Sequence, residues 1–376
     1  MSNSFLRNVF FAAAFGIIFL FIFQISAQQN EKNPDRKPFQ VCKVLDLVID
    51  GNGGIASDGR TVYAALTEGK IAAVDISINE TIWIAELGGS AASSPVVADG
   101  VILIAMSVEP SPRLFALSSN TGLPVWSEAL PAASRYFLYQ TAIGGLVISD
   151  RGDVLFFNTS DGKIIRRSSL GGVLQFEPAV SPHGLMASVV SGPVIAFSVT
   201  GETLFRKQSN SPVAAGLLLG RMRAVYSDST GRIHALNAPG GKSLWRFKTG
   251  GRVTQLLAVH SRILAGSADN FLYLLDSDNG SVRWKTRLPG RIEKLAVIDN
   301  ETIAATVVGE RQVFVIEAEN GRLVDGITVP GDGSPLNIAP VFAAGRLVIA
   351  STTGLAIFSP ECGAKIQTAG RRKPAV

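Results

Sequence analysis

From about residue 40 onward, the hydrophobic positions of the chain fall in short runs separated by turn residues. Between Ser93 and Leu130, four runs rich in Val, Ile, Leu and Phe are separated by pairs such as Asp-Gly and Thr-Gly. These pairs favour tight hairpins, and runs of this length are typical of strands. The stretch therefore predicts four antiparallel strands. Beyond residue 40 no run has a helical period and a useful length.

The four-strand pattern recurs at a fixed period of about 40 residues, which is typical of a repeat architecture. Each unit is marked by a glycine shortly before its last apolar run, except that the first unit has an asparagine, the commonest non-glycine residue at positive φ. We expect these residues to occupy a left-handed turn between the third and fourth strands. The eight repeat-turn residues are Asn79, Gly122, Gly162, Gly201, Gly241, Gly280, Gly321 and Gly363.

Four residues after the turn residue, most units carry a large aromatic side chain. A four-stranded unit cannot bury both of its faces alone, so it must stack on its neighbours, and a flat ring is well suited to fill the seam. We interpret these aromatics as blade-packing residues rather than as a cofactor-stacking site. They are Trp83, Trp126, Phe205, Trp245 and Trp284. The third unit has Arg166 and the seventh Asp325 at this position, so those two seams should be packed differently.

Four-stranded units of this period stacked around an axis form a β-propeller. The predicted fold is therefore all-β, an eight-bladed β-propeller of four-stranded antiparallel blades. The segment from Phe39 to Val48 lies where a fourth strand would lie, but no first three strands precede it. We expect this N-terminal strand to supply the outer strand of the eighth blade, alone or shared with Ala364 to Thr368, and so to close the ring.

The chain has two cysteines, Cys42 in this first strand and Cys362 near the end of the last unit. Ring closure would make them neighbours, and an oxidising compartment would then join them in a structural disulfide. The alternative is two buried thiols. Cys42 also aligns with the tryptophan position of the other units. The histidines His183, His234 and His260 fall in three different units without ligand-like spacing, so no metal site is expected.

The N-terminal region predicts export. Residues 1–27 contain one basic residue, Arg7, then an apolar run from Val9 to Phe23 and a polar break that ends at Ala27. This layout is typical of a signal peptide, and an uncleaved N-terminal membrane anchor is the alternative. We interpret residues 28–38 as a flexible linker, 39–368 as the propeller and 369–376 as a basic C-terminal tail. The expected location is periplasmic or secreted.

The net charge is +5, but much of the basic excess lies in the two terminal segments. Without Arg7 of the signal and without Arg371, Arg372 and Lys373 of the tail, the balance falls to +1. A chain that binds nucleic acid would carry its positive charge on the folded domain. We therefore expect no nucleic-acid partner.

The units resemble the repeats of the pyrroloquinoline-quinone-type (PQQ-like) propellers, an eight-bladed family whose blades carry an Ala-Leu-Asp/Asn-x-x-x-Gly-Lys-x-x-Trp run. The resemblance implies a fold far more specifically than a function, because the family includes both enzymes and scaffolds. The residues that match are Ala235, Leu236, Asn237, Gly241, Lys242 and Trp245, with Ala116, Leu117, Gly122 and Trp126 as a second copy.

Quinoprotein dehydrogenases of this family resemble one another in a ring of two adjacent cysteines over the quinone and in a calcium held beside an aspartate base. This chain has no adjacent cysteines, and its acidic residues mostly follow hairpin turns, where they have an ordinary structural role. We therefore expect no catalytic, cofactor-binding or metal-binding residues. Examples of the turn acids are Asp58, Asp99, Asp228, Asp269 and Asp276.

In length and blade number the chain is similar to the propeller subunits of the outer-membrane β-barrel assembly machinery, periplasmic lipoproteins that dock on the barrel-inserting protein. The resemblance implies a non-catalytic scaffold with protein partners. Those subunits carry a lipidated cysteine directly after the signal, whereas Gln28 follows Ala27 here. Membrane association would then need the N-terminal segment or a partner. The alternatives are a secreted propeller that binds a small ligand or glycan, indicated by the aromatic stretch from Ala133 to Gln140, and a quinoprotein dehydrogenase.

Overall fold

The computed structural model describes residues 37–182, 184–198, 200, 202–220, 223–299, 301–331, 335–351 and 353–362. The predicted signal peptide, most of the predicted linker and the predicted C-terminal tail therefore lie outside the described residues, as do Ala364–Thr368, His183, Gly201 and Gly363. The regular secondary structure of the described residues is almost entirely β-strand, with a 3-10 turn at Thr67–Gly69. No helix among these residues is long and apolar enough to cross a membrane.

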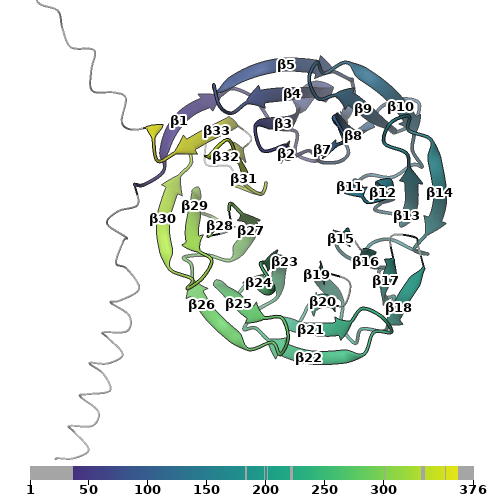
Figure 1. Ribbon diagram of the computed structural model, residues 1–376, viewed down its shortest axis with the longest axis vertical. Coiled ribbons are helices and arrows are strands. Elements are labelled where there is room, and N and C mark those ends of the chain that lie inside the picture. The colour runs from purple at the N-terminus through teal and green to yellow at the C-terminus, as the bar shows by residue number, and fades with distance from the viewer. Residues whose placement is uncertain are drawn as a thin grey trace, which may run out of the picture.

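The strands form eight antiparallel sheets arranged in a closed ring, which confirms the predicted eight-bladed propeller (Figure 1). The strands of each blade are given from the innermost to the outermost. Blade 1 consists of β2 (Ile55–Ser57), β3 (Thr61–Leu66), β4 (Lys70–Asp75) and β5 (Glu80–Glu86), and blade 2 of β6 (Ser90–Ala91), β7 (Val96–Ala98), β8 (Val101–Ser107), β9 (Arg113–Ser118) and β10 (Pro124–Ala129). Blade 3 consists of β11 (Tyr136–Thr141), β12 (Gly144–Ser149), β13 (Asp153–Phe157) and β14 (Ile164–Ser169), and blade 4 of β15 (Ala179–Ser181), β16 (Gly184–Ser188), β17 (Val194–Ser198) and β18 (Thr203–Lys207). In blade 2 the innermost strand is divided into β6 and β7, which both pair with β8.

Blades 5 to 7 repeat this order, and blade 8 departs from it only in its outer strand. Blade 5 consists of β19 (Val213–Leu219), β20 (Arg223–Asp228), β21 (Arg232–Asn237) and β22 (Ser243–Lys248), and blade 6 of β23 (Val253–Val259), β24 (Arg262–Ser267), β25 (Phe271–Asp276) and β26 (Val282–Arg287). Blade 7 consists of β27 (Ile292–Val297), β28 (Thr302–Val307), β29 (Gln312–Glu317) and β30 (Leu323–Thr328), and blade 8 of β31 (Val341–Ala343), β32 (Arg346–Ser351), β33 (Gly354–Ser359) and β1 (Gln40–Leu45).

The N-terminal strand closes the ring, as the sequence predicts. β1 pairs antiparallel with β33, so that Gln40 lies opposite Ser359 and Leu45 opposite Leu355. Figure 1 shows the first and last described strands side by side in one blade. The chain thus fastens its beginning to its end by a ladder of backbone hydrogen bonds.

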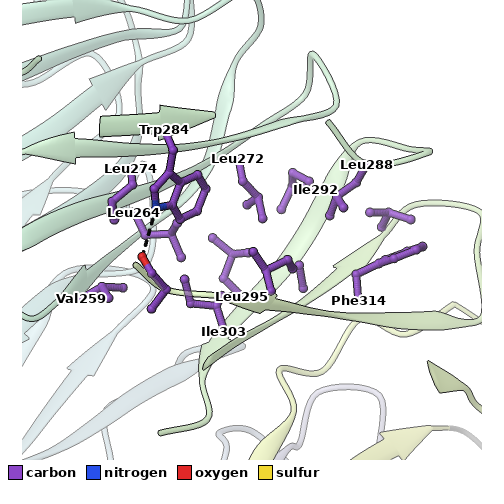
Figure 2. Packing of buried hydrophobic residues seen from close by; sticks show 14 residues of the cluster. Val259, Leu264, Leu272, Leu274, Trp284, Leu288, Ile292, Leu295, Ile303 and Phe314 are labelled. Carbon is purple, nitrogen blue, oxygen red and sulfur yellow. Dashed lines mark hydrogen bonds between the residues drawn. The ribbon is translucent and has the colours of Figure 1, made fainter. Parts of the chain in front are cut away.

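The core is divided among the seams between blades. The structure has eight clusters of buried hydrophobic residues, and each combines side chains from two neighbouring blades. In the cluster between blades 6 and 7, Trp284 packs with Leu264 and Leu274 of its own blade and with Leu295 and Ile303 of the next one (Figure 2). Each blade therefore buries both of its faces against neighbours, which a single sheet cannot do alone.

Candidate docking surface and blade seams

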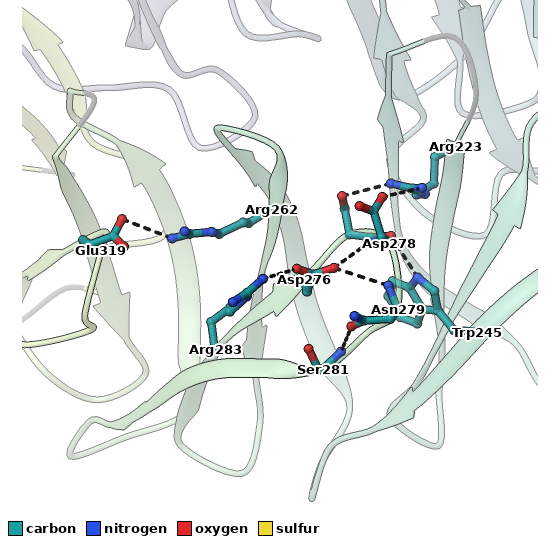
Figure 3. A network of polar contacts seen from close by, with 10 residues as sticks. Arg223, Trp245, Arg262, Asp276, Asp278, Asn279, Ser281, Arg283 and Glu319 are labelled. Carbon is teal, nitrogen blue, oxygen red and sulfur yellow. Dashed lines mark hydrogen bonds and ion pairs between the residues drawn. The ribbon is translucent and has the colours of Figure 1, made fainter.

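The tryptophans lie in the outer strands and reach across each seam to the turn between the third and fourth strands of the following blade. The indole Nε1–H of Trp83 donates to the carbonyl of Ser119 at 2.9 Å, and that of Trp126 to the carbonyl of Thr159 at 2.9 Å. Trp245 and Trp284 donate in the same way to Ser277 and Ala318, at 2.9 Å and 3.0 Å (Figures 2 and 3). In each case the acceptor lies three residues before the turn glycine.

The turn residues have the left-handed backbone that the sequence predicts at every described position, with φ between 59° and 75°. They also lie against the ring of the preceding blade. A Cβ added to Gly122 would lie 2.5 Å from Cε3 of Trp83, and one added to Gly280 would lie 2.5 Å from Cε3 of Trp245. Glycine is therefore needed at these turns both for its φ and for the close approach of the indole.

The seams without tryptophan use other contacts. Phe205 packs against Gly241, whose added Cβ would lie 2.9 Å from the Cβ of Phe205. Arg166 donates from its guanidinium to the carbonyl of Thr200. Asp325 accepts a hydrogen bond from the backbone N–H of Phe39 at 2.8 Å, and so holds the chain directly before β1.

A β-bulge in every outer strand gives the tryptophans their position. The register shifts by one residue just before Trp83 and Trp126, and again at the same place in the other blades. Such a bulge re-aims the side chain that follows it. In β1 the bulged residue is Cys42, so Lys43 stands in the register of the tryptophans. The alignment of Cys42 with the tryptophan position was therefore wrong by one residue, because sequence spacing does not reveal which residue is bulged.

Cys42 and Cys362 are joined by a disulfide with a Cα–Cα distance of 5.1 Å. Cys362 follows β33, the third strand of blade 8, and Cys42 lies in β1, the fourth. In the other seven blades a turn connects these two strands. In blade 8 the two strands come from opposite ends of the chain, and the disulfide provides their covalent connection.

Three arginines at one repeat position form a second contact across the seams, which the sequence-based interpretation missed. Arg223 donates to Oγ of Ser277 at 2.9 Å and to Oδ1 of Asp278 at 2.8 Å (Figure 3). Arg262 likewise binds Oε2 of Glu319 at 3.2 Å. Each arginine begins the second strand of its blade and contacts the turn between the third and fourth strands of the next.

The third arginine, Arg346, makes the same contact across the closing seam, where it donates to the carbonyls of Ile76 at 2.7 Å and Ser77 at 3.1 Å. Arg223, Arg262 and Arg346 recur at one or two repeat periods. The alignment that revealed the glycines therefore also contains the signal for these arginines.

The central channel contains a cavity of about 290 Å³ bounded by the inner strands of blades 3 to 7. Its lining includes the polar side chains of Glu177, Gln255, Glu293 and Lys294, together with those of Tyr139 and Thr254. Gln255 accepts a hydrogen bond from the backbone N–H of Leu295 at 2.8 Å. Across the part of the chain that the structure describes, no group of three His, Cys, Asp or Glu side chains could hold a metal ion.

The aromatic stretch before β12 is held by backbone contacts. The hydroxyl of Tyr139 donates to the carbonyl of Pro178 at 2.7 Å, and that of Tyr136 donates to the carbonyl of Pro131. Burial raises the pKa of Tyr139 well above its usual value, and that of Tyr136 to about 12. Both hydroxyls therefore stay protonated and serve to fix strands rather than to exchange protons.

The outer strands of blades 1 to 3, together with Leu123 directly before β10, carry exposed aliphatic side chains, which we call the aliphatic rim. Its side chains are 50% to 67% exposed. Three of the five occupy bulge positions, where the fold accepts other residues, since Arg283 and Cys42 stand at the same position in blades 6 and 8. The rim side chains are more exposed than the aliphatic groups on other outer strands, such as Leu244 at 46% and Val282 at 41%, and exposed apolar groups that gather on one surface can mark a protein-docking site. The rim consists of Ile82, Ile84, Leu123, Val125 and Ile165.

Comparison with known proteins agrees with this architecture. A family model described as "Outer membrane protein assembly factor BamB" matches residues 27–217 and 229–367. The chain is 26% identical to the BamB of Yersinia pestis over 241 residues, which are 59% of this chain and 60% of that protein. It is 27% identical to the BamB of Moranella endobia over 211 residues, 52% of this chain and 53% of that one. The chain thus matches less than two thirds of the length of either relative.

Solved structures show the same fold at low sequence identity. The crystal structure of BamB from Moraxella catarrhalis is similar with a TM-score of 0.54 and 20% identity, over 68% of this chain and 82% of that one. The computationally designed Ika8 protein is similar with a TM-score of 0.71 and 14% identity, over 86% and 99%. Because the family model covers most of the repeat region, the chain belongs to the BamB family of outer membrane protein assembly factors.

Proposed function

We propose that this protein is a non-catalytic propeller scaffold that binds protein partners during the assembly of outer-membrane proteins. The observation that carries the proposal is the match of the BamB family model to almost the whole repeat region. The curated relatives that match are likewise described as outer membrane protein assembly factors. Such a role requires export to the periplasm, which is what the N-terminal apolar run predicts.

The aliphatic rim is the surface that we assign to the partner. A docking surface needs apolar side chains that are exposed in the free protein and become buried on binding. Ile82 and Val125 meet this condition, because they are 50% and 52% exposed while the tryptophans beside them face the seams. The partner would be a protein component of the barrel assembly machinery that presents an apolar strand or loop.

Binding to purified barrel assembly proteins tests the proposal. The wild-type protein should bind one of them and increase the rate at which a β-barrel substrate folds into membranes. The double variant Ile82→Ser/Val125→Ser should bind at least about tenfold more weakly, because loss of central interface contacts typically costs more than about 1 kcal/mol each. The matched control is Leu244→Ser/Val282→Ser, which also removes two exposed aliphatic groups from outer strands, in blades 5 and 6.

Each result has a distinct meaning. Failure of the wild-type protein to bind any assembly component or to affect folding would contradict the scaffold role. Equal effects of the two double variants would contradict the assignment of the aliphatic rim and leave the scaffold role standing. Turnover of an alcohol or sugar by the purified protein with pyrroloquinoline quinone and calcium would overturn the non-catalytic assignment.

A further inference from the structure

A pocket of about 320 Å³ opens between blades 4 and 5. It is bordered by the end of β18, by the segment that follows it, and by β20, β21 and β22. Four cationic side chains and one carboxylate line it, so the pocket carries a net charge of +3 with neutral histidine. The cations are Lys207, Arg232, Arg246 and Lys248, and the carboxylate is Asp228.

The register of the sheet places these groups on one face of blade 5. Tyr226 lies opposite His234, and His234 lies opposite Arg246, while Arg232 lies opposite Lys248. Because side chains alternate along a strand, Arg232 and His234 share a face. On the other blade, Lys207 approaches this face from β18. Four strands from two blades therefore combine to make a polar pocket in a seam that is apolar elsewhere.

The carboxylate of Asp228 is fully engaged inside the protein. Its Oδ1 accepts hydrogen bonds from the backbone N–H of Thr230 at 2.9 Å and of Arg232 at 3.1 Å, and from the Thr230 hydroxyl at 2.5 Å. Its Oδ2 lies 3.0 Å from Nε2 of His234. The imidazole is in turn stacked on Tyr226, with ring centroids 4.6 Å apart. Asp228 is only 5% exposed, so its charge organises the wall of the pocket rather than neutralising the cations.

The four cations differ in what already holds them. Lys207 donates to the carbonyl of Gly241 and to Oγ of Ser243, both at 3.2 Å, and Lys248 donates to the carbonyl of Thr230. Both keep further N–H donors, since an ammonium group has three. Among the residues that the structure describes, neither Arg232 nor Arg246 has a side-chain hydrogen bond or ion pair. Two guanidinium groups with all their donors available thus face a cavity that contains no competing acid except the engaged Asp228.

We propose that this pocket binds a phosphate group. The planar fork of arginine matches the spacing of phosphate oxygens and binds them in bidentate fashion, and lysine adds point charge. A net charge of +3 spread over four side chains exceeds what a single carboxylate would neutralise, whereas a phosphate carries up to two negative charges and its oxygens accept from several directions. The phosphate belongs either to a free phosphate or diphosphate compound or to an anionic lipid headgroup.

Isothermal titration of the full chain with pyrophosphate at constant ionic strength, with sodium chloride as the blank, tests the proposal. The double variant Arg232→Gln/Arg246→Gln should bind at least about tenfold more weakly, because it loses the charge-assisted hydrogen bonds that the two guanidinium groups would make to phosphate oxygens. The matched control is Lys285→Gln/Arg287→Gln. These residues lie in β26 at the register positions of Arg246 and Lys248, one blade further on. The control should keep the wild-type affinity.

Vesicle binding identifies the source of the phosphate. Vesicles of phosphatidylcholine with phosphatidylglycerol are compared with phosphatidylcholine alone, for the same three proteins. Pyrophosphate binding that only the pocket variant loses supports a free phosphate compound, and the same pattern with anionic vesicles supports a lipid headgroup. No binding to either probe, or equal losses in both double variants, overturns the proposal. A protein that binds a polyglutamate peptide but neither pyrophosphate nor anionic vesicles overturns it as well, because the ligand would then be an acidic protein segment.

Discussion

At the scale of single residues, the seam tryptophan is fixed by three independent features of the chain. A bulge aims it at the seam, a backbone carbonyl three residues before the next turn glycine accepts its N–H, and the missing Cβ of that glycine makes room for its ring. The bulge belongs to the outer strand that carries the tryptophan, whereas the carbonyl and the glycine belong to one turn of the next blade. The run Gly-x-x-x-Trp therefore describes a contact between neighbouring blades rather than within one.

Trp284 should make the largest contribution to stability among these side chains, because it is 9% exposed and packs in the largest cluster. We expect Trp284→Ala to lower the free energy of unfolding by about 3–5 kcal/mol through the cavity that it leaves. Urea denaturation followed by circular dichroism measures this. The comparison is Ile165→Ala on the exposed outer strand, which should have little effect. An unchanged unfolding midpoint for Trp284→Ala would show that the ring is not part of the core.

A pair of substitutions in blade 2 separates the effect of the close contact with the indole from the effect of the positive backbone φ. Gly122 and Gly100 both have positive φ, 70° and 81°, so alanine is strained at both, by about 1–2 kcal/mol. Only at Gly122 would the new Cβ collide, because nothing lies within 4 Å of a Cβ at Gly100. Gly122→Ala should therefore lower the melting temperature distinctly more than Gly100→Ala. Equal shifts would show that the indole moves aside without cost.

At the scale of strands and turns, the sequence predicts the repeating parts of each blade well. Apolar runs, turn glycines and aromatic spacing are local signals, and among the described residues the turn residues have the left-handed backbone that was predicted. What depends on two or more blades could not be predicted in the same way. The bulge at Cys42 is defined by its pairing with β33. Lys207 and Arg246 line the same pocket only because blades 4 and 5 face each other.

The turn between β4 and β5 offers a pH-dependent test at this scale. The Ser77 hydroxyl, followed by the guanidinium of Arg60, lowers the pKa of Asp75 from 3.8 to about 2. Because the pKa is lower in the folded state, the ionised carboxylate stabilises the fold above pH 4, and this contribution is lost as the pH falls toward 2.

Asp75→Asn should therefore have a lower melting temperature than the wild type at pH 7. The two melting curves should converge between pH 4 and pH 2, and differential scanning fluorimetry across this range would show it. A difference that stays constant down to pH 2 would mean that the hydrogen bonds of Asp75 do not depend on its charge.

At the scale of the whole molecule, every blade has two neighbours and the ring has no free end. Blade 8 is the place where this arrangement depends on contacts between the two ends of the chain. There, β1 is held by its ladder with β33, by the hydrogen bond from Phe39 to Asp325 and by the disulfide. Arg346 then connects the same blade to blade 1. Loss of closure would therefore expose two blade faces at once.

Reduction of the disulfide tests how strongly closure stabilises the ring. The bond spans 320 residues, for which loop-closure entropy gives an upper value of about 6 kcal/mol. A reductant should lower the melting temperature of the wild type and increase hydrogen exchange first in blade 8. The double variant Cys42→Ser/Cys362→Ser should melt at the temperature of the reduced wild type and be insensitive to the reductant. Identical melting of the oxidised and reduced wild type would contradict a stabilising role.

The strand that closes the ring is also the first to be synthesised. At about 5–20 residues per second, the 320 residues between the two cysteines take roughly 15 to 65 s to follow. During that time β1 has no partner strand, and the chain must keep it from pairing with other exposed edges. A chain that is shortened at its C-terminal end so that it lacks β33 would leave β1 permanently without a partner strand. Closure of the ring therefore depends on synthesis up to β33, because β1 gains its partner strand only when β33 has been made.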